Sequence, residues 1–116
     1  MKILIVDDDP NILRLYKEEL EEEGYIIVTA SNGQEAIEKF ESEDPDLVTL
    51  DILLPDIDGI KLLRQMKEKK PRLPIIMSTA YDYRDDFAVW ASEAYIVKSS
   101  DMTELKATIK KLIERE

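Results

Sequence analysis

The chain has 116 residues, of which 44% are hydrophobic and 36% charged, a composition typical of one globular domain. Its net charge of −10 argues against a nucleic-acid-binding segment, which would need a basic surface. It contains no cysteine and no histidine, which excludes thiol and imidazole catalysis. No apolar run is long enough to span a bilayer and no signal-peptide pattern is present, so we expect a cytoplasmic protein without membrane contact.

Strand-like and helix-like patterns alternate along the whole chain. In chain order, we predict a strand at 2–6, a helix at 10–23, a strand at 25–30, a short helix after Asn32-Gly33, a strand at 46–51, a helix at 59–69, a strand at 74–79, a helix at 83–92, a strand at 94–98 and a helix at 101–115. Asp9 before Pro10 is a typical helix start, and Gly24 a typical helix end.

Five strands alternating with five helices predict right-handed crossover connections. We therefore expect a doubly wound α/β fold of (βα)5 type, with a five-stranded parallel sheet between two helical layers, as in flavodoxin-like three-layer sandwiches. No linker or internal repeat interrupts the pattern, so residues 1–116 are predicted to form one domain.

Polar side chains stand where four of the predicted strands end. They are Asp7 and Asp8, Asp51, Ser78 and Thr79, and Lys98. Because parallel strands end at one edge of the sheet, these groups are expected to converge there. Clustered carboxylates favour a hard divalent cation such as Mg²⁺, and an ammonium and a hydroxyl beside it suit a phosphoryl group.

With these motifs in order, the whole chain resembles the receiver domain (CheY-like) of bacterial response regulators. The resemblance implies that Asp51 is the phosphoacceptor and that Thr79 and Lys98 contact the phosphoryl group. Asp8, Asp51 and the backbone carbonyl of Leu53 would bind Mg²⁺ or Mn²⁺, with Asp7 acting through water. Tyr95 resembles the family's aromatic switch, although packing within a half-buried strand would also explain it.

The resemblance also implies the function: a signalling switch in a two-component system or phosphorelay. The partners would be a sensor histidine kinase or a histidine phosphotransfer protein, and a downstream effector protein or covalent effector domain. The domain would be no enzyme beyond its own phosphorylation and dephosphorylation, and a monomer or a weak phosphorylation-dependent dimer.

Several residues have simpler expected roles. Asp9 is predicted to cap a helix, Asp56 and Asp58 to be loop acids near the start of the next helix, and Ser78 to bond backbone at a strand end. Trp90 is expected to be a packing residue.

The chain departs from the family pattern after Thr79. Ser99 stands where the family usually has proline after the lysine, and the stretch up to Lys98 is a few residues short. We therefore expect a short or displaced helix at 83–92, and the family's partner and dimer surfaces do not transfer to this chain.

Other classes of function fit less well. An aspartyl phosphatase or phosphotransferase would resemble Asp-x-Asp, but position 53 is Leu and no cap domain fits this length. A flavodoxin-like binding module would need a hydroxyl- and glycine-rich phosphate loop after the first strand. A receiver-like interaction module without phosphorylation would not need the complete set of acids, hydroxyl and lysine.

Overall fold

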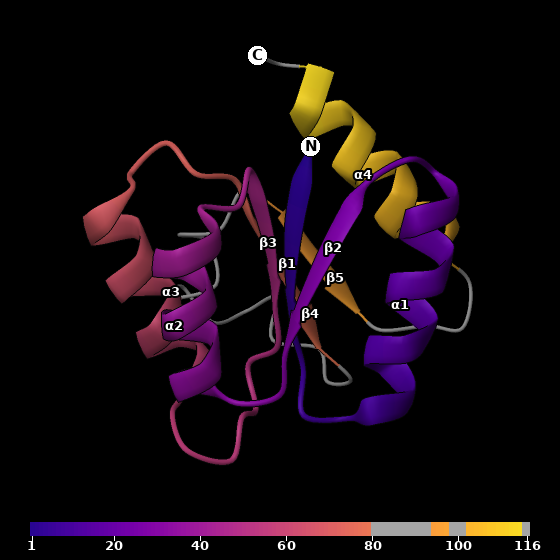
Figure 1. Ribbon diagram of the computed structural model, residues 1–116. Coiled ribbons are helices and arrows are strands. Elements are labelled where there is room, and N and C mark those ends of the chain that lie inside the picture. The colour runs from indigo at the N-terminus through magenta and orange to yellow at the C-terminus, as the bar shows by residue number, and fades with distance from the viewer. Residues whose placement is uncertain (80–93, 98–101, 115–116) are drawn as a thin grey trace.

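The computed structural model describes residues 1–79, 94–97 and 102–114 (Figure 1). The strands are β1 (Lys2–Val6), β2 (Ile26–Ala30), β3 (Leu47–Leu50), β4 (Ile75–Thr79) and β5 (Ala94–Val97). The described helices are α1 (Pro10–Glu22), α2 (Gly33–Glu43), α3 (Gly59–Lys69) and α4 (Thr103–Glu114). The predicted elements at these positions are confirmed to within about two residues at each end. The helix expected at 83–92, with Trp90, lies outside the described residues.

All pairs of neighbouring strands are parallel, in the order β2-β1-β3-β4-β5. The chain therefore starts in the interior of the sheet, moves to one edge and then crosses to the other side. The direction of winding reverses between β1 and β3, and an open α/β sheet forms its ligand crevice at the carboxyl ends of the two strands at this point.

The sheet separates two hydrophobic cores, and β1 contributes to both through its alternating side chains. Leu4 and Val6 pack in the core that includes Phe40 of α2 and Leu62 of α3. On the opposite face, the core contains residues of α1 and α4 together with Ile3 and Ile5. Figure 1 shows the two pairs of helices on either side of the sheet. A strand buried on both faces explains the uninterrupted apolar run at the N-terminus.

Short-range signals define the helix ends. Asp9 accepts a hydrogen bond from the Asn11 N–H (2.9 Å) and caps α1, as predicted. Gly24 has a φ of 93°, a left-handed conformation that suits glycine and ends the helix. Among the described helices, none combines the length and the apolar character that a bilayer-spanning segment requires.

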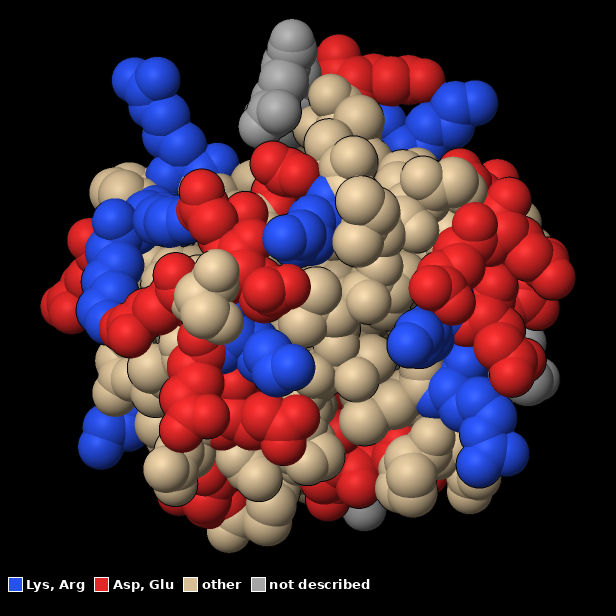
Figure 2. Space-filling model, viewed as in Figure 1, with Lys and Arg blue, Asp and Glu red and all other residues tan. Residues whose placement is uncertain are grey.

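The surface charge is unevenly distributed (Figure 2). Acidic side chains gather over the C-terminal part of α1, where Glu18, Glu21, Glu22 and Glu23 are exposed. Lys106 of α4 pairs with Glu19 (2.9 Å) and Glu23 (3.7 Å), which ties the two helices of this layer together.

Candidate metal and phosphoryl-acceptor site

Three aspartates meet at the carboxyl ends of β1 and β3, the two strands between which the winding reverses. Asp7 and Asp8 follow β1 directly, and Asp51 follows β3 directly. The Asp7 N–H donates to the carbonyl of Ala30 (3.0 Å), and the Asp51 N–H donates to the carbonyl of Val6 (3.1 Å). Backbone hydrogen bonding between strands thus continues one residue beyond β1 and β3 and holds both aspartates in place.

The carboxylates form a compact oxygen-only cluster. One carboxylate oxygen from each of Asp7, Asp8 and Asp51 lies within 4.8 Å of the other two. Asp7 and Asp51 are buried, with exposed fractions of 2% and 5%, whereas Asp8 is exposed. Like charges repel strongly when water is largely excluded, and a divalent cation offsets that repulsion. The set of donors therefore fits Mg²⁺, which favours carboxylate oxygens and keeps several of its waters.

Two backbone N–H groups orient the buried carboxylates. The Asp9 N–H donates to Asp7 Oδ1 (2.9 Å), and the Leu53 N–H donates to Asp51 Oδ1 (3.2 Å). Both donors lie two residues after the aspartate that accepts the bond, as in an Asx turn. The turns that follow β1 and β3 thus set the direction of the carboxylates.

The segment after Asp51 folds back on itself. Leu53 forms an isolated antiparallel bridge with Asp58, and the Gly59 N–H donates to the carbonyl of Ile52 (2.7 Å). A Cβ atom on Gly59 would lie 2.1 Å from the Asp51 carbonyl oxygen and 2.6 Å from Ile52 Cα. Only glycine permits this backbone approach, so Gly59 is required for the path of the chain around Asp51. Leu53, whose carbonyl the resemblance assigned to the metal, lies in this loop and is 48% exposed.

The two loop acids have different roles. Asp58 lies in the loop before α3, as predicted, and it caps this helix by accepting a hydrogen bond from the Ile60 N–H (2.9 Å). Asp56 also lies in this loop, two residues before the cap of α3, as predicted. Its carboxylate bonds the first amides of the preceding helix, α2: the Gly33 N–H at 2.7 Å and the Gln34 N–H at 3.0 Å. These two bonds lower the pKa of Asp56 below its ordinary value.

The end of β4 contains a buried pair of hydroxyls. Ser78 Oγ lies 3.1 Å from the Tyr16 hydroxyl of α1, and Ser78 is only 3% exposed. The expected backbone partner of Ser78 is thus replaced by a side chain from another element. Tyr16 could have been suspected from the sequence, because a tyrosine on the apolar face of a helix needs a partner for its hydroxyl. No comparable signal links Asp56 to α2.

The remaining predicted site residues are described in part or not at all. Thr79 pairs with Val97 in the parallel register of β4 and β5, and Tyr95 pairs with Met77. Lys98 and Ser99 lie outside the described residues. The structure thus brings together Asp7, Asp8 and Asp51 at one edge of the sheet, and places Thr79 at the end of the strand next to β3.

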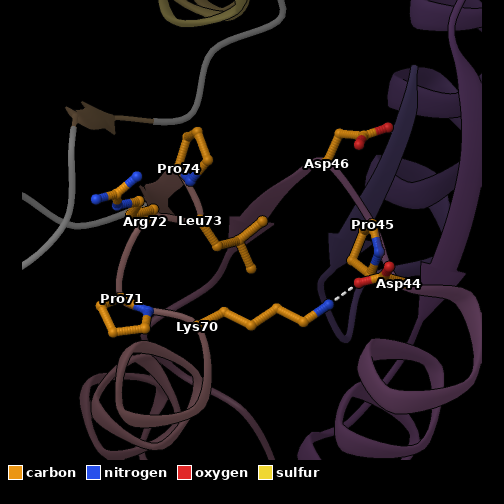
Figure 3. Close-up of a pocket in the computed structure, with 8 residues that line it drawn as sticks. All are labelled: Asp44, Pro45, Asp46, Lys70, Pro71, Arg72, Leu73 and Pro74. Carbon is orange, nitrogen blue, oxygen red and sulfur yellow. Dashed lines mark ion pairs between the residues drawn. The ribbon is translucent and has the colours of Figure 1, made fainter. Parts of the chain in front are cut away.

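A depression of about 440 Å³ lies at the opposite edge of the sheet (Figure 3). It is lined by the connections that lead into β3 and β4, including Pro45, Pro71 and Pro74. Lys70 forms an ion pair with Asp44 across it, and its ammonium lies 5.3 Å from the centre of the Phe40 ring. These contacts join the ends of α2 and α3 and are remote from the carboxylate cluster.

The fold and the cluster together define a class of protein: a parallel α/β domain with an oxygen-only carboxylate cluster where the winding of its sheet reverses. The chain matches the response regulator receiver domain family over residues 3–110, and it belongs to this family.

Two regulators of Bacillus subtilis are among its relatives. The chain is 39% identical over 117 residues to the alkaline phosphatase synthesis transcriptional regulatory protein PhoP, covering 98% of this chain and 49% of PhoP. It is 43% identical over 118 residues to the transcriptional regulatory protein ResD, covering 98% of this chain and 48% of ResD. The chain thus spans about half the length of these curated relatives.

Two solved structures are similar to this chain in both fold and sequence. The response regulator TrrA from Thermotoga maritima, in complex with Mg²⁺-BeF, is 52% identical with a TM-score of 0.92, covering 96% of this chain and 97% of that chain. TrrA in complex with the histidine kinase ThkA gives 52% identity and a TM-score of 0.90 over the same shares.

Proposed function

We propose that this chain is a phosphorylation-controlled signalling switch in which Asp51 accepts a phosphoryl group in a Mg²⁺-dependent reaction. The observation that carries the proposal is the buried carboxylate of Asp51, grouped with Asp7 and Asp8 in a member of the receiver family. A nucleophilic carboxylate needs to be close to a phosphorus atom and shielded from competing water. Asp51, just beyond a buried strand and only 5% exposed, is shielded from water, and a bound metal beside it would bring the phosphoryl group close.

We assign the metal to Asp8, Asp51 and the Leu53 carbonyl, with Asp7 acting through water. Mn²⁺ would be accepted by the same oxygen donors. A bound divalent ion would offset the negative charge of the carboxylates and of the approaching phosphoryl group. Without that compensation, three carboxylates would repel a phosphoryl oxygen.

The proposed transfer step is a single displacement. An Asp51 carboxylate oxygen forms a bond to phosphorus, and the bond from phosphorus to the donor nitrogen or acyl oxygen breaks. The product is an acyl phosphate on Asp51, and the donor leaves with the bonding electron pair. Thr79 and Lys98 would contact the phosphoryl oxygens, and Tyr95 would respond as the switch residue. Apart from making and hydrolysing this acyl phosphate, we propose no enzymatic activity.

The partners are proposed from the relatives. One similar structure contains a histidine kinase, and the curated relatives are named as transcriptional regulators. We propose a sensor histidine kinase or a histidine phosphotransfer protein as donor, and an effector protein or effector domain as target. We further propose that residues 1–116 form a (βα)5 receiver domain, which acts in the cytoplasm as a monomer or a weak phosphorylation-dependent dimer.

Intact-mass spectrometry tests the assignment. The protein is incubated with acetyl phosphate and Mg²⁺, and we expect the mass of one added phosphoryl group. The adduct should be absent from Asp51→Asn and absent when EDTA removes the metal. Asp46→Asn is the matched control, because Asp46 precedes the same strand at its other end. An adduct that survives Asp51→Asn would refute the proposal, and hydrolysis of acetyl phosphate without any accumulation of the adduct would favour a phosphatase.

A further inference from the structure

We propose that Asp56 is a positioning residue for the phosphoryl-acceptor site, because it ties the 53–58 loop to the start of α2 and so holds Leu53 against Asp51. This inference rests on the proposed function, since it concerns the same site. Among the described residues, the hydrogen bonds to the Asp56 carboxylate come from Gly33 and Gln34 of α2, and none comes from the carboxylate cluster or from a proposed metal ligand.

The first N–H groups of α2 donate hydrogen bonds to two different kinds of acceptor, one local in the chain and one distant. The Glu35 N–H donates to Asn32 Oδ1 (2.8 Å), a local cap from the residue before the helix. The Gly33 and Gln34 N–H groups donate to Asp56, which is 22 or 23 residues away in the chain. The two oxygens of one carboxylate each accept one of these bonds. A charged acceptor at a helix N-terminus is also favoured by the helix dipole.

Close packing accompanies these hydrogen bonds. A Cβ atom on Gly33 would lie 2.1 Å from Ile57 Cγ2 and 3.1 Å from Asp56 Oδ1. The absence of a side chain at Gly33 therefore allows the tip of the loop to approach the helix. In Figure 1, the loop between β3 and α3 runs beside the first turn of α2. The loop tip is thus held by two charge-assisted bonds and by a steric fit.

The loop base lies directly at the acceptor carboxylate. Leu53 and Asp58 form the bridge that closes the loop, and the Leu53 N–H donates to Asp51 Oδ1 (3.2 Å). With the base closed and the tip attached to α2, few backbone conformations remain for the residues between them. Release of the tip would let Leu53 move, and both its N–H bond to Asp51 and its carbonyl would lose their orientation.

The test compares two variants that both weaken the cap of α2. Asp56→Ala removes the bonds from Gly33 and Gln34 and frees the loop, whereas Asn32→Ala removes the bond from Glu35 and leaves the loop attached. Mg²⁺ affinity is measured by titration calorimetry with MgCl₂ alone. Partners that orient metal ligands typically contribute 10–100-fold to metal affinity, so we expect about tenfold weaker binding in Asp56→Ala and little change in Asn32→Ala.

Two further measurements separate positioning from charge and from stability. The titrations are repeated at high salt, because a long-range charge effect is screened there and a positioning effect persists. Amide hydrogen exchange in metal-free protein should be faster at Leu53 and Leu54 in Asp56→Ala than in Asn32→Ala. Asp56→Asn, which keeps one acceptor oxygen, should lie between Asp56→Ala and wild type in both measurements.

The outcomes distinguish the two proposals. Wild-type protein that binds no Mg²⁺ would overturn the proposed function, and the exchange data would still decide whether Asp56 positions the loop. Wild-type protein that binds Mg²⁺ while Asp56→Ala and Asn32→Ala behave alike, in affinity and in exchange, would overturn the role of Asp56. Asp56 would then be a helix cap only.

Discussion

Individual residues at the site are constrained by contacts that differ in kind. Asp51 is held by backbone bonds on both sides, from its own N–H to Val6 and from the Leu53 N–H to its carboxylate. Gly59 is constrained by space, since its position leaves no room for a Cβ atom. Tyr16 and Ser78 satisfy each other's hydroxyls inside the core. Each constraint predicts a different response to substitution.

Gly59→Ala is expected to disturb both stability and metal binding. The new Cβ atom would meet backbone atoms, so the chain around Asp51 must shift; overpacking of this kind costs about 1–3 kcal/mol. Urea unfolding and Mg²⁺ titration measure the two effects. Gly24→Ala is the control, because Gly24 has positive φ and no neighbouring atom within 4 Å of a Cβ. It should lose about 1 kcal/mol to backbone strain and bind Mg²⁺ as the wild type does. Unchanged Mg²⁺ affinity in Gly59→Ala would contradict the prediction.

Tyr16→Phe is expected to destabilise the protein by about 1–3 kcal/mol, because it leaves the Ser78 hydroxyl buried without this partner. Ser78→Ala should act in the same direction. The double variant should be more stable than the sum of the single effects predicts, since residues in contact are energetically coupled. Chemical denaturation of all four proteins gives this coupling free energy. Additive effects would show that the two hydroxyls contribute independently.

At the scale of elements, local capping and long-range attachment act on the same helix. Asn32 caps α2 from within its own connection, as Asp9 and Asp58 cap α1 and α3. Asp56 adds bonds from the connection between β3 and α3. The start of α2 and the loop after the acceptor strand therefore form one joined unit, although they belong to different βα units.

The pH dependence of stability should report this attachment. Because hydrogen bonds from Gly33 and Gln34 lower the pKa of Asp56 from its ordinary 3.8, the folded state favours the ionised carboxylate. The contribution of the ionised Asp56 carboxylate to the free energy of unfolding is therefore complete above the unfolded-state pKa. It is lost as the pH falls through the lower folded-state pKa. The difference in unfolding free energy between wild type and Asp56→Asn should be constant between about pH 5 and 7 and shrink below about pH 4. A difference that grows on acidification would contradict this sign.

At the scale of the whole molecule, the sheet order creates the site. Asp51 is distant in the chain from the adjacent Asp7 and Asp8, and the three meet because β1 and β3 are neighbours in the folded sheet. The unfolded chain has no such cluster. A cation that binds the cluster must therefore bind the folded state preferentially.

Mg²⁺ should accordingly stabilise the fold. At a concentration one hundred times the dissociation constant, the expected gain in unfolding free energy is about 2.7 kcal/mol. Thermal denaturation with MgCl₂ and with EDTA measures it. Mg²⁺ should not stabilise Asp51→Asn in this way. When EDTA removes the metal, Asp51→Asn should be more stable than the wild type, because one of three repelling charges is removed. Equal stabilisation of Asp51→Asn and wild type by Mg²⁺ would place the ion elsewhere.

The sequence by itself determined the local structure and the chemistry available. Apolar runs predicted the strands, Asp9 before Pro10 marked a helix start, and carboxylates at strand ends predicted an oxygen-only cation site. These signals act over a few residues, because capping bonds and alternation of side chains depend on near neighbours.

Only the tertiary structure decided which distant groups meet. The cap of α2 by Asp56 and the pairing of Tyr16 with Ser78 join elements that no short-range pattern connects. Their geometry depends on how the helical layers pack against the sheet, and on a glycine that permits close approach. The sequence predicted Asp56 only as a loop acid before α3, because a carboxylate bonds whichever exposed amides the fold brings to it, here those of α2.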